Sequence, residues 1–188
     1  MLSDPSGWPD AHGDRLYRYA LSRVRDESAA EDLVQETLLT AYKSRDRFKG
    51  ESSELTWLTG ILRFKIFEFY RRQAKEVPLG FDEGDDRESE LFEGGRHWRP
   101  EQAPRDWGAD PVRAAEGAEF FAALRACLDA LTPAAARAFT LREMEGVEHH
   151  EAAEAIGVAP GHLAVLLYRA RMRLRRCLER GYFVRGAA

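Results

Sequence analysis

The stretch VEHHEAAEAIGVAPGHLAVLLYRARMRLRRCLE, from Val147 to Glu179, decides how the C-terminal part of this chain folds. Its opening residues, up to Ile156, predict a short helix, and Gly157 follows where a left-handed residue commonly ends one. Pro160 suits the first turn of a second helix, which we expect to continue to about residue 180. A short helix, a glycine-containing turn and a second helix form a helix-turn-helix, here over about residues 148–171.

The second of these helices becomes strongly basic along its length. Residues 169–185 hold seven arginines and one acidic residue, Glu179. Such a row can neutralise phosphates and gain affinity through counterion release. The second helix of this motif normally lies in the major groove of DNA. The segment therefore favours DNA binding, and the alternative is a solvated helix face on an all-helical protein.

Two more helices are predicted before this motif. An apolar stripe at helical spacing marks the first, and it consists of Phe120, Phe121, Leu124, Cys127, Leu128 and Leu131. Thr132 is expected to cap the next helix, with Pro133 in its first turn. We interpret Cys127 as a small buried hydrophobic residue. Residues 119–180 thus form one helical domain, and residues 181–188 a C-terminal tail.

The N-terminal part is also helical by its periodicity. After a tail at residues 1–11, apolar positions recur every three to four residues through residues 12–77. Ser28 stands three residues before Glu31, which is the spacing of a capping box and predicts a helix start. Glycine and serine at residues 49–53 predict a turn, and a further helix continues to Arg72.

Residues 78–118 lose the periodicity and carry eleven acidic against five basic residues. We interpret them as an acidic linker containing glycine and proline. Trp98 and Trp107 are unusual in a spacer: either they order the segment on binding or they dock it on a neighbouring domain. The predicted fold is therefore all-α, with two small helical domains joined by a long acidic linker.

Composition limits the functional classes. The 188 residues are 44% hydrophobic and 32% charged, with a net charge of −4, as expected of a globular protein. No apolar run approaches the ~18 residues of a membrane span, so no membrane insertion is expected. The N-terminus lacks the apolar stretch of a secretory signal. Two cysteines, Cys127 and Cys177, cannot build a disulfide scaffold, and we expect a cytoplasmic protein.

Two long segments carry a family resemblance. Residues 30–72, AEDLVQETLLTAYKSRDRFKGESSELTWLTGILRFKIFEFYRR, resemble region 2 of bacterial RNA polymerase sigma factors of the sigma-70 family, in the extracytoplasmic-function (ECF) group. Residues 131–179, LTPAAARAFTLREMEGVEHHEAAEAIGVAPGHLAVLLYRARMRLRRCLE, resemble region 4. The two occur in the family's order with a linker between them, and the pair is far more specific than either alone.

The resemblance implies a partner for the helix that starts before Asp32. In the family, the D-L-x-Q-E run binds the clamp helices of the largest subunit of core RNA polymerase, and the flap of the second-largest subunit is a further partner. The polymerase-binding residues it implies here are Asp32, Leu33, Gln35, Glu36 and Leu39. An exposed polar face with a few apolar neighbours suits a helix-on-helix interface, although an ordinary amphipathic helix has the same pattern.

The resemblance also places the promoter-melting segment, on Phe48, Gly50, Ser52, Thr56, Trp57 and Leu58. The minus-ten DNA contacts it implies are Lys49, Ser52, Ser53, Trp57, Arg63, Phe64, Lys65 and Phe67. Cations would steer the unpaired strand, and aromatic faces can stack bases for ~1–3 kcal/mol each. The alternative for the aromatic residues is the core, which we favour for Trp57 and Phe69. Phe64 and Glu68 replace the asparagine and aspartate of many members, which leaves the base preference open.

For the minus-thirty-five element, the resemblance implies contacts from His162, Val165, Leu166, Arg169, Arg171 and Arg173. The first turns of this helix are unusually apolar, with Ala164, Val165 and Leu166 where the family has polar side chains. Val165 or Leu166 could read thymine methyl groups. A partner protein could equally cover such an apolar patch.

The sequence thus predicts a sigma factor that binds core polymerase and promoter DNA, with an anti-sigma factor as a possible partner and without enzymatic activity or a cofactor. The first alternative is a stand-alone helix-turn-helix regulator. The second is a metal-dependent hydrolase built on His149 and His150, but Glu154 replaces the second histidine of the zinc-protease pattern. A site made of these histidines and Cys177 would need the last helix to fold back, and we predict no metal.

Overall fold

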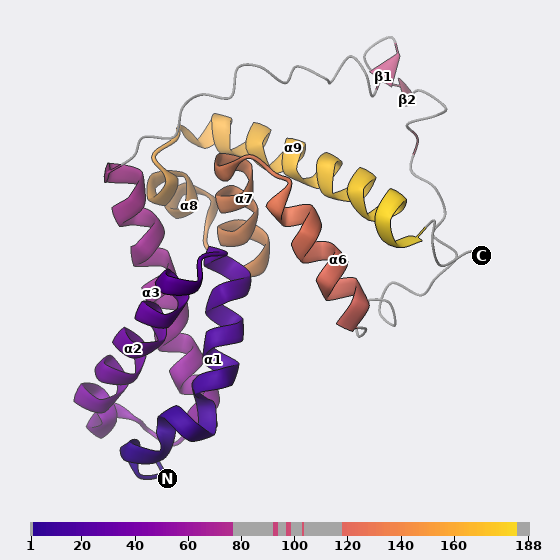
Figure 1. The fold of residues 1–188 in the computed structure, drawn as a ribbon. Helices are drawn as coiled ribbons and strands as arrows, with labels where there is room; N and C mark the ends of the chain where they lie inside the picture. The colour runs from indigo at the N-terminus through magenta and orange to yellow at the C-terminus, as the bar shows by residue number, and fades with distance from the viewer. Residues whose placement is uncertain (1, 77–91, 94–96, 99–102, 104–117, 184–188) are drawn as a thin grey trace. The chain divides into compact units, whose positions relative to one another are not determined.

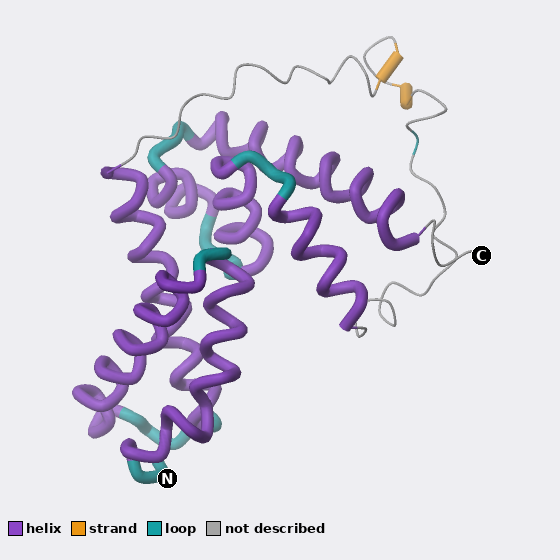
Figure 2. Tube along the Cα trace, in the orientation of Figure 1, coloured by secondary structure: helices purple, strands orange, loops and turns teal. Residues whose placement is uncertain are grey.

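The computed structural model describes residues 2–76, 92–93, 97–98, 103 and 118–183. Helices make up nearly all of this part of the chain (Figures 1 and 2). The chain divides into two compact units, and the first contains residues 1–78 together with residues 132–170. The second contains residues 79–131 and 171–188.

Three helices form the N-terminal part of the first unit: α1 (Trp8–Val24), α2 (Glu27–Ser44) and α3 (Glu54–Glu76). They pack against one another, as Figure 1 shows. Short 3-10 turns precede α1 at Pro5–Gly7 and follow α2 at Arg45–Arg47. The core between the helices consists of fully buried apolar side chains, among them Leu16, Ala20, Ala30, Ala41, Leu58, Leu62 and Ile66.

The start of α2 differs from the prediction. The helix is capped by Asp26, whose carboxylate accepts a hydrogen bond of 2.8 Å from the backbone amide of Ala29. Arg25, in the left-handed conformation with φ of 57°, ends α1 just before it. Ser28 therefore lies inside the first turn of α2, and the predicted capping box with Glu31 is wrong. An aspartate at this position accepts hydrogen bonds from the free backbone amides as well as a serine does. Its negative charge is also favourable at a helix N-terminus.

The residues that were predicted to form an N-terminal tail belong instead to the helical bundle. Trp8 is 1% exposed, and its ring lies 6.1 Å from that of Trp57 at the start of α3. The carboxylate of Glu54 accepts hydrogen bonds from Ser3 and contacts the His12 ring at 2.7 Å. Helix α1 consequently starts at Trp8, four residues before the predicted boundary.

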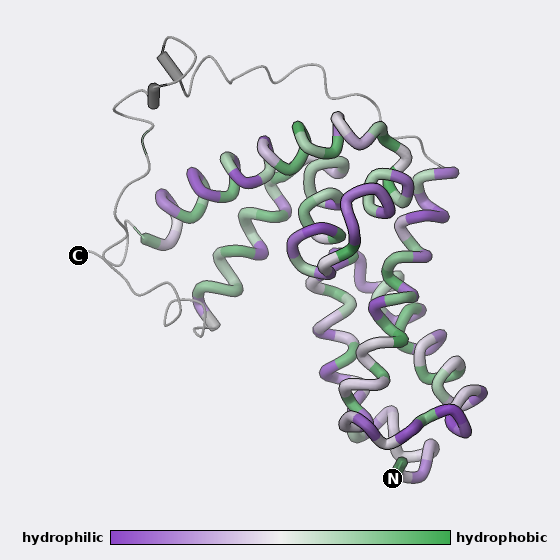
Figure 3. Tube along the Cα trace, turned by 180° about the vertical axis from the view of Figure 1, so that it is seen from behind, coloured by the Kyte–Doolittle hydropathy of each residue, from purple (hydrophilic) through white to green (hydrophobic). Residues whose placement is uncertain are grey.

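The first unit continues with α7 (Pro133–Phe139), one π-helical turn (Thr140–Met144), α8 (His149–Ile156) and the beginning of α9 (Pro160–Leu178). Thr132 caps α7 as predicted, since its hydroxyl accepts a hydrogen bond from the amide of Ala135. Gly157 ends α8 with φ of 74°, which confirms the predicted left-handed cap. The helices are amphipathic, with hydrophilic and hydrophobic positions alternating along them (Figure 3).

The helix-turn-helix packs directly on the N-terminal bundle. Helix α8 lies against α3, and a Cβ atom at Gly157 would stand 3.6 Å from the Cβ of Ala74. Ala152, Ala153 and Ala155 are buried along α8, and small side chains of this kind allow close approach of helices. The boundary between the two compact units therefore differs from the predicted domain boundaries, because the helix-turn-helix shares a unit with α1–α3.

In the second unit, α6 (Ala118–Asp129) is joined to the last turns of α9 by a disulfide between Cys127 and Cys177. Cys127 is buried as predicted but is not a free thiol. A π-helical turn (Glu179–Phe183) follows α9, and the ring of Tyr182 in it lies 5.6 Å from Phe120.

Of the predicted linker, the structure describes a two-stranded antiparallel ladder, β1 (Phe92–Glu93) and β2 (His97–Trp98), which the sequence did not predict. Trp107 and most of residues 78–118 lie outside the described residues.

Candidate nucleic-acid and polymerase interfaces

One side of α2 presents an exposed mixed surface, which we call the α2 face: Asp32, Gln35, Leu39 and Tyr42. Spacings of three and four residues place these side chains on one side of the helix. Leu39 is 60% exposed and Tyr42 52% exposed, which is unusual for large apolar side chains. The opposite side of the helix, with Thr37 and Ala41, is buried in the bundle.

Among the residues predicted to bind polymerase, Leu33 requires a correction. It is 2% exposed and packs in the core of the bundle, so its side chain is unavailable to a partner. Tyr42 takes a place on the α2 face that the sequence analysis missed, because its spacing matched the buried stripe. One signal distinguishes Tyr42 from the buried positions of the stripe: its hydroxyl group, which allows a tyrosine near the end of a helix to remain partly in water.

Glu36 connects the predicted polymerase and DNA residues. Its carboxylate pairs with Lys65 at 3.5 Å and with Arg72 at 3.9 Å, both on α3. Lys65 also pairs with Glu68 one turn along its own helix. Lys65 therefore lies between two carboxylates, which lowers its net attraction for a phosphate.

The turn before α3 holds the first group of predicted minus-ten contacts. Lys49, Ser52 and Ser53 are exposed, and Gly50 has φ of 76°, a conformation that glycine adopts without strain. Ser53 has a structural task as well, because its hydroxyl accepts a hydrogen bond of 3.1 Å from the amide of Thr56 and so caps α3.

Trp57 lies in an aromatic cluster rather than in open solvent. Its ring is 5.2 Å from that of Phe48 and 6.1 Å from that of Trp8. The side chain is half-buried, so part of its surface packs inside the bundle and part stays accessible, and Trp57 is not among the buried core residues.

Further along α3, the predicted contacts Arg63, Phe64 and Phe67 come together at one groove. The groove has a volume of about 600 Å³, and α8 forms its other wall through Glu151, Glu154 and neighbouring residues. Phe64 is 59% exposed, as a base-stacking residue requires. An ion pair of 3.6 Å between Arg71 and Glu154 crosses the groove at the surface.

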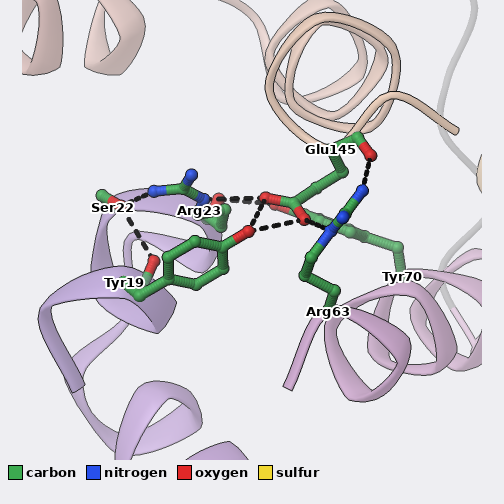
Figure 4. Close-up of polar contacts among 6 residues, drawn as sticks. All are labelled: Tyr19, Ser22, Arg23, Arg63, Tyr70 and Glu145. Carbon is green, nitrogen blue, oxygen red and sulfur yellow. Dashed lines mark hydrogen bonds and ion pairs between the residues drawn. The ribbon is translucent and has the colours of Figure 1, made fainter. Parts of the chain in front are cut away.

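Arg63 is engaged by a buried carboxylate, and Figure 4 shows the cluster. Its Nε atom lies 3.1 Å from Oε2 of Glu145, and its Nη2 atom donates to the main-chain oxygen of Glu145. The Glu145 carboxylate also accepts hydrogen bonds from Arg23 at 2.8 Å and from the Tyr19 hydroxyl at 2.9 and 3.0 Å. We call these four residues the Glu145 cluster.

The Glu145 cluster joins three elements that are far apart in the sequence. Tyr19 and Arg23 belong to α1, Arg63 to α3, and Glu145 follows the π-helical turn after α7. Glu145 is only 3% exposed. Burial, followed by the charge of Glu145, raises the pKa of Tyr19 to about 12. Sequence analysis missed Glu145, because one acidic residue near a helix end gives no signal of a distant partner.

The start of α9 carries the predicted minus-thirty-five contacts. Val165 is 43% exposed and His162 half-buried, and Ala164 beside them is exposed, so this surface is largely apolar. Leu166 requires a correction: at 1% exposure it packs in the core with Leu163 and cannot read a base.

The arginines that follow on α9 differ in exposure. Arg171 is exposed, and Arg169 and Arg173 are half-buried. Arg169 belongs to the first compact unit, and Arg171 and Arg173 to the second.

The sequence analysis expected neither a metal site nor a membrane-spanning segment. In the described part, no three histidine, cysteine or acidic residues gather as metal ligands would, and the sulfur of Cys177 is bonded to Cys127. No helix there is both long and apolar enough to cross a membrane.

The family model "Sigma-70 region 2" matches residues 10–76, and "Sigma-70, region 4" matches residues 121–174. The "Probable RNA polymerase sigma factor" of Haemophilus influenzae is 30% identical over 166 residues, which cover 88% of this chain and 85% of that protein. "ECF RNA polymerase sigma factor SigM" of Bacillus subtilis is 27% identical, covering 88% of this chain and 90% of that one.

Among solved structures, the sigma factor RpoE of Bartonella quintana, in a co-crystal with the anti-sigma factor NepR, is similar with a TM-score of 0.44. It is 24% identical, and the match covers 95% of this chain and 98% of that chain.

Proposed function

This chain belongs to the sigma-70 family of bacterial RNA polymerase sigma factors, in the ECF group, and on that premise we propose how its surfaces divide the work of promoter recognition. A sigma factor binds core RNA polymerase and promoter DNA in transcription initiation. We assign region 2 to residues 12–77, extended by the buried Trp8, and region 4 to residues 119–180.

The α2 face is the proposed site for the clamp helices of the polymerase. The observation that carries this assignment is the exposure of Leu39 and Tyr42 beside Asp32 and Gln35, on a helix whose other side is buried. Apolar and aromatic side chains at the centre of an interface contribute most of its affinity, and the polar ones around them set the register.

The DNA contacts are proposed on two surfaces. Lys49, Ser52 and Phe64 would meet the unpaired strand of the minus-ten element, since all three are exposed. Arg63 would join them once its guanidinium is released from Glu145. On α9, Val165 and His162 would contact bases of the minus-thirty-five element, Val165 by apolar contact. The arginines of α9 would neutralise phosphates of the same element.

Run-off transcription with core polymerase on a promoter library tests the function. We expect specific transcripts that depend on both proteins. Leu39→Ala and Gln35→Ala should each weaken core binding by about tenfold, which corresponds to ~1.4 kcal/mol. Asp14→Ala, at an exposed position of α1, is the matched control and should leave core binding unchanged. Unchanged affinity of both α2 variants would remove this assignment, and DNA binding without any core dependence would favour a stand-alone regulator.

Three finer points are proposed with it. The protein would act in the cytoplasm, and it would act by binding and not by catalysis, since its family consists of transcription initiation factors.

An anti-sigma factor would control the protein by covering the exposed apolar residues of region 2, above all Leu39 and Phe64. A co-expressed candidate should then suppress run-off transcription, and the Leu39→Ala variant should lose part of that suppression. Suppression that is unaffected by Leu39→Ala and by Phe64→Ala would place the contact elsewhere.

A further inference from the structure

We propose that the N-terminal segment at residues 2–12 is a positioning element: it fixes the turn at residues 48–53, here called the minus-ten loop, and so sharpens the discrimination between bases of the minus-ten element. The proposal rests on the DNA role proposed above for Lys49 and Ser52. Most of the segment precedes residue 10, where the match to the region 2 family model begins. All these residues belong to the first compact unit.

The minus-ten loop has few contacts of its own that could fix its shape. Residues 49–53 are all exposed. Among the described residues, the side-chain hydrogen bonds of the loop are local: the Ser52 hydroxyl donates to the Ser53 carbonyl at 3.3 Å, and the Ser53 hydroxyl accepts from the Thr56 amide at 3.1 Å. A segment with few buried contacts samples several conformations. The loop therefore depends on anchors at its ends.

The first anchor is Glu54, the first residue of α3, where the loop enters the helix. The backbone amide and the hydroxyl of Ser3 donate to its two carboxylate oxygens, at 2.6 and 2.9 Å. The His12 ring lies 2.7 Å from one of the same oxygens, and both side chains of this pair are mostly buried. Hydrogen bonds to a charged group are shorter and stronger than neutral ones, so the N-terminal segment holds this end of the loop firmly.

The second anchor is Trp8, which acts on the other end of the loop. This buried ring lies 6.1 Å from that of Trp57, close to edge-on at 74°. Trp57 in turn contacts Phe48, the first residue of the loop, with the ring centres 5.2 Å apart. Aromatic rings attract one another at such separations. Trp8 therefore supports Phe48 through Trp57, and both ends of the loop depend on the same N-terminal segment.

This anchoring matters more for specificity than for affinity. Discrimination between two bases is a difference of two affinities, and it requires polar groups that stay in place, because a loop that can shift also adapts to the wrong base. A phosphate contact from Lys49 carries no base information and tolerates such movement. Loss of the anchors should therefore flatten the base preference, whereas a merely structural role would lower the amount of active protein and leave the preference unchanged.

The test uses the full chain with core polymerase on a promoter library whose minus-ten positions are randomised. Sequencing of the run-off transcripts gives the ratio of the best to the worst base at each position, and this ratio does not depend on the fraction of active protein. We expect Glu54→Ala to lower the ratio about fivefold at the most selective position and to leave core binding within about twofold. Glu27→Ala, the matched control at the first and exposed position of α2, should change neither quantity.

A flattened preference with intact core binding supports the proposal, and an unchanged preference in Glu54→Ala overturns it. If that variant loses its helical circular dichroism, the double variant Ser3→Ala and His12→Ala decides, because it removes two side-chain partners of the carboxylate and leaves α3 intact. It should lower the ratio about threefold, and no change would overturn the proposal.

A variant of the loop itself separates the proposal from the function on which it rests. If Lys49→Ala combined with Ser52→Ala changes neither the base preference nor promoter binding, the DNA role of the loop is wrong and the positioning role is wrong with it. If the loop variant changes them and Glu54→Ala does not, only the positioning role is wrong.

Discussion

The hydroxyl group of Tyr19 lies 2.9 and 3.0 Å from the two carboxylate oxygens of Glu145, although 126 residues separate them in the sequence. The phenol donates its proton to an acceptor that two arginines also bind, and the Arg23 guanidinium lies 3.7 Å above its ring. Region 2 and the helix-turn-helix are thus joined through a group that can itself lose a proton.

We predict that the stability of the first unit falls as the pH rises from about 10 to about 12. Burial and the charge of Glu145 raise the pKa of Tyr19 to about 12, and burial also raises the pKa of Tyr70. The unfolded chain ionises its tyrosines near pH 10, so the folded state retains protons that the unfolded state has released, and this contribution is lost through that window. Chemical denaturation at a series of pH values measures the effect.

Tyr19→Phe is the control for this pH dependence. It should reduce the decline above pH 10 and remove one tyrosine from the late phase of a phenolate absorbance titration. A decline of the same size in Tyr19→Phe and in the parent protein would contradict the assignment to Tyr19.

The cap of α2 gives a second prediction. Asp26→Ala removes the acceptor for the amide of Ala29, and it should lower the free energy of unfolding by ~1 kcal/mol. Ser28→Ala should cost much less, because Ser28 is an exposed residue inside the helix. Urea denaturation of the two variants distinguishes them, and a larger loss for Ser28→Ala would restore the capping box.

The disulfide gives a third prediction. Cys127 and Cys177 are 50 residues apart, and a cross-link over such a loop stabilises a protein by about 2–4 kcal/mol, mainly by restricting the unfolded chain. Reduction by dithiothreitol should therefore lower the melting temperature. The double variant Cys127→Ser and Cys177→Ser should already melt at the lower temperature and should not respond to the reductant. A response of equal size in that variant would show that reduction acts elsewhere.

A fourth prediction separates the two kinds of upstream contact on α9. Arg169→Ala should weaken duplex binding by a similar factor on every sequence and reduce the slope of log affinity against log salt by about one, as loss of a phosphate contact does. Val165→Ala should weaken binding only to the preferred sequence and leave the salt slope unchanged, since a methyl contact carries no charge. Binding of holoenzyme to promoter fragments at several salt concentrations measures both, and a sequence-dependent loss in Arg169→Ala would indicate a base contact instead.

Features that depend on local backbone chemistry could be predicted from the sequence. Thr132 caps the start of α7 and Gly157 ends α8, because a free backbone amide and a left-handed turn each require a particular residue type. The α2 cap shows the limit of such patterns, since Asp26 and Ser28 can each cap a helix and the structure uses the one that directly follows Arg25.

Periodicity identifies which residues share a helix face but leaves open how much of that face is covered. Leu33 and Leu166 are buried, whereas Leu39 and Tyr42, with equally suitable spacing, are exposed. Contacts between distant segments give no local signal at all. The disulfide and the Glu145 cluster were missed for that reason, since each depends on helices that meet only in the folded chain.

The burial of Trp8 has a practical consequence for handling the protein. A recombinant version trimmed to begin at His12 would remove the indole that covers Trp57 and would leave Glu54 without Ser3. The exposed aromatic surface would promote self-association during purification. Affinity handles therefore need a spacer ahead of Ser3, and truncation of this end should be avoided when polymerase binding is assayed.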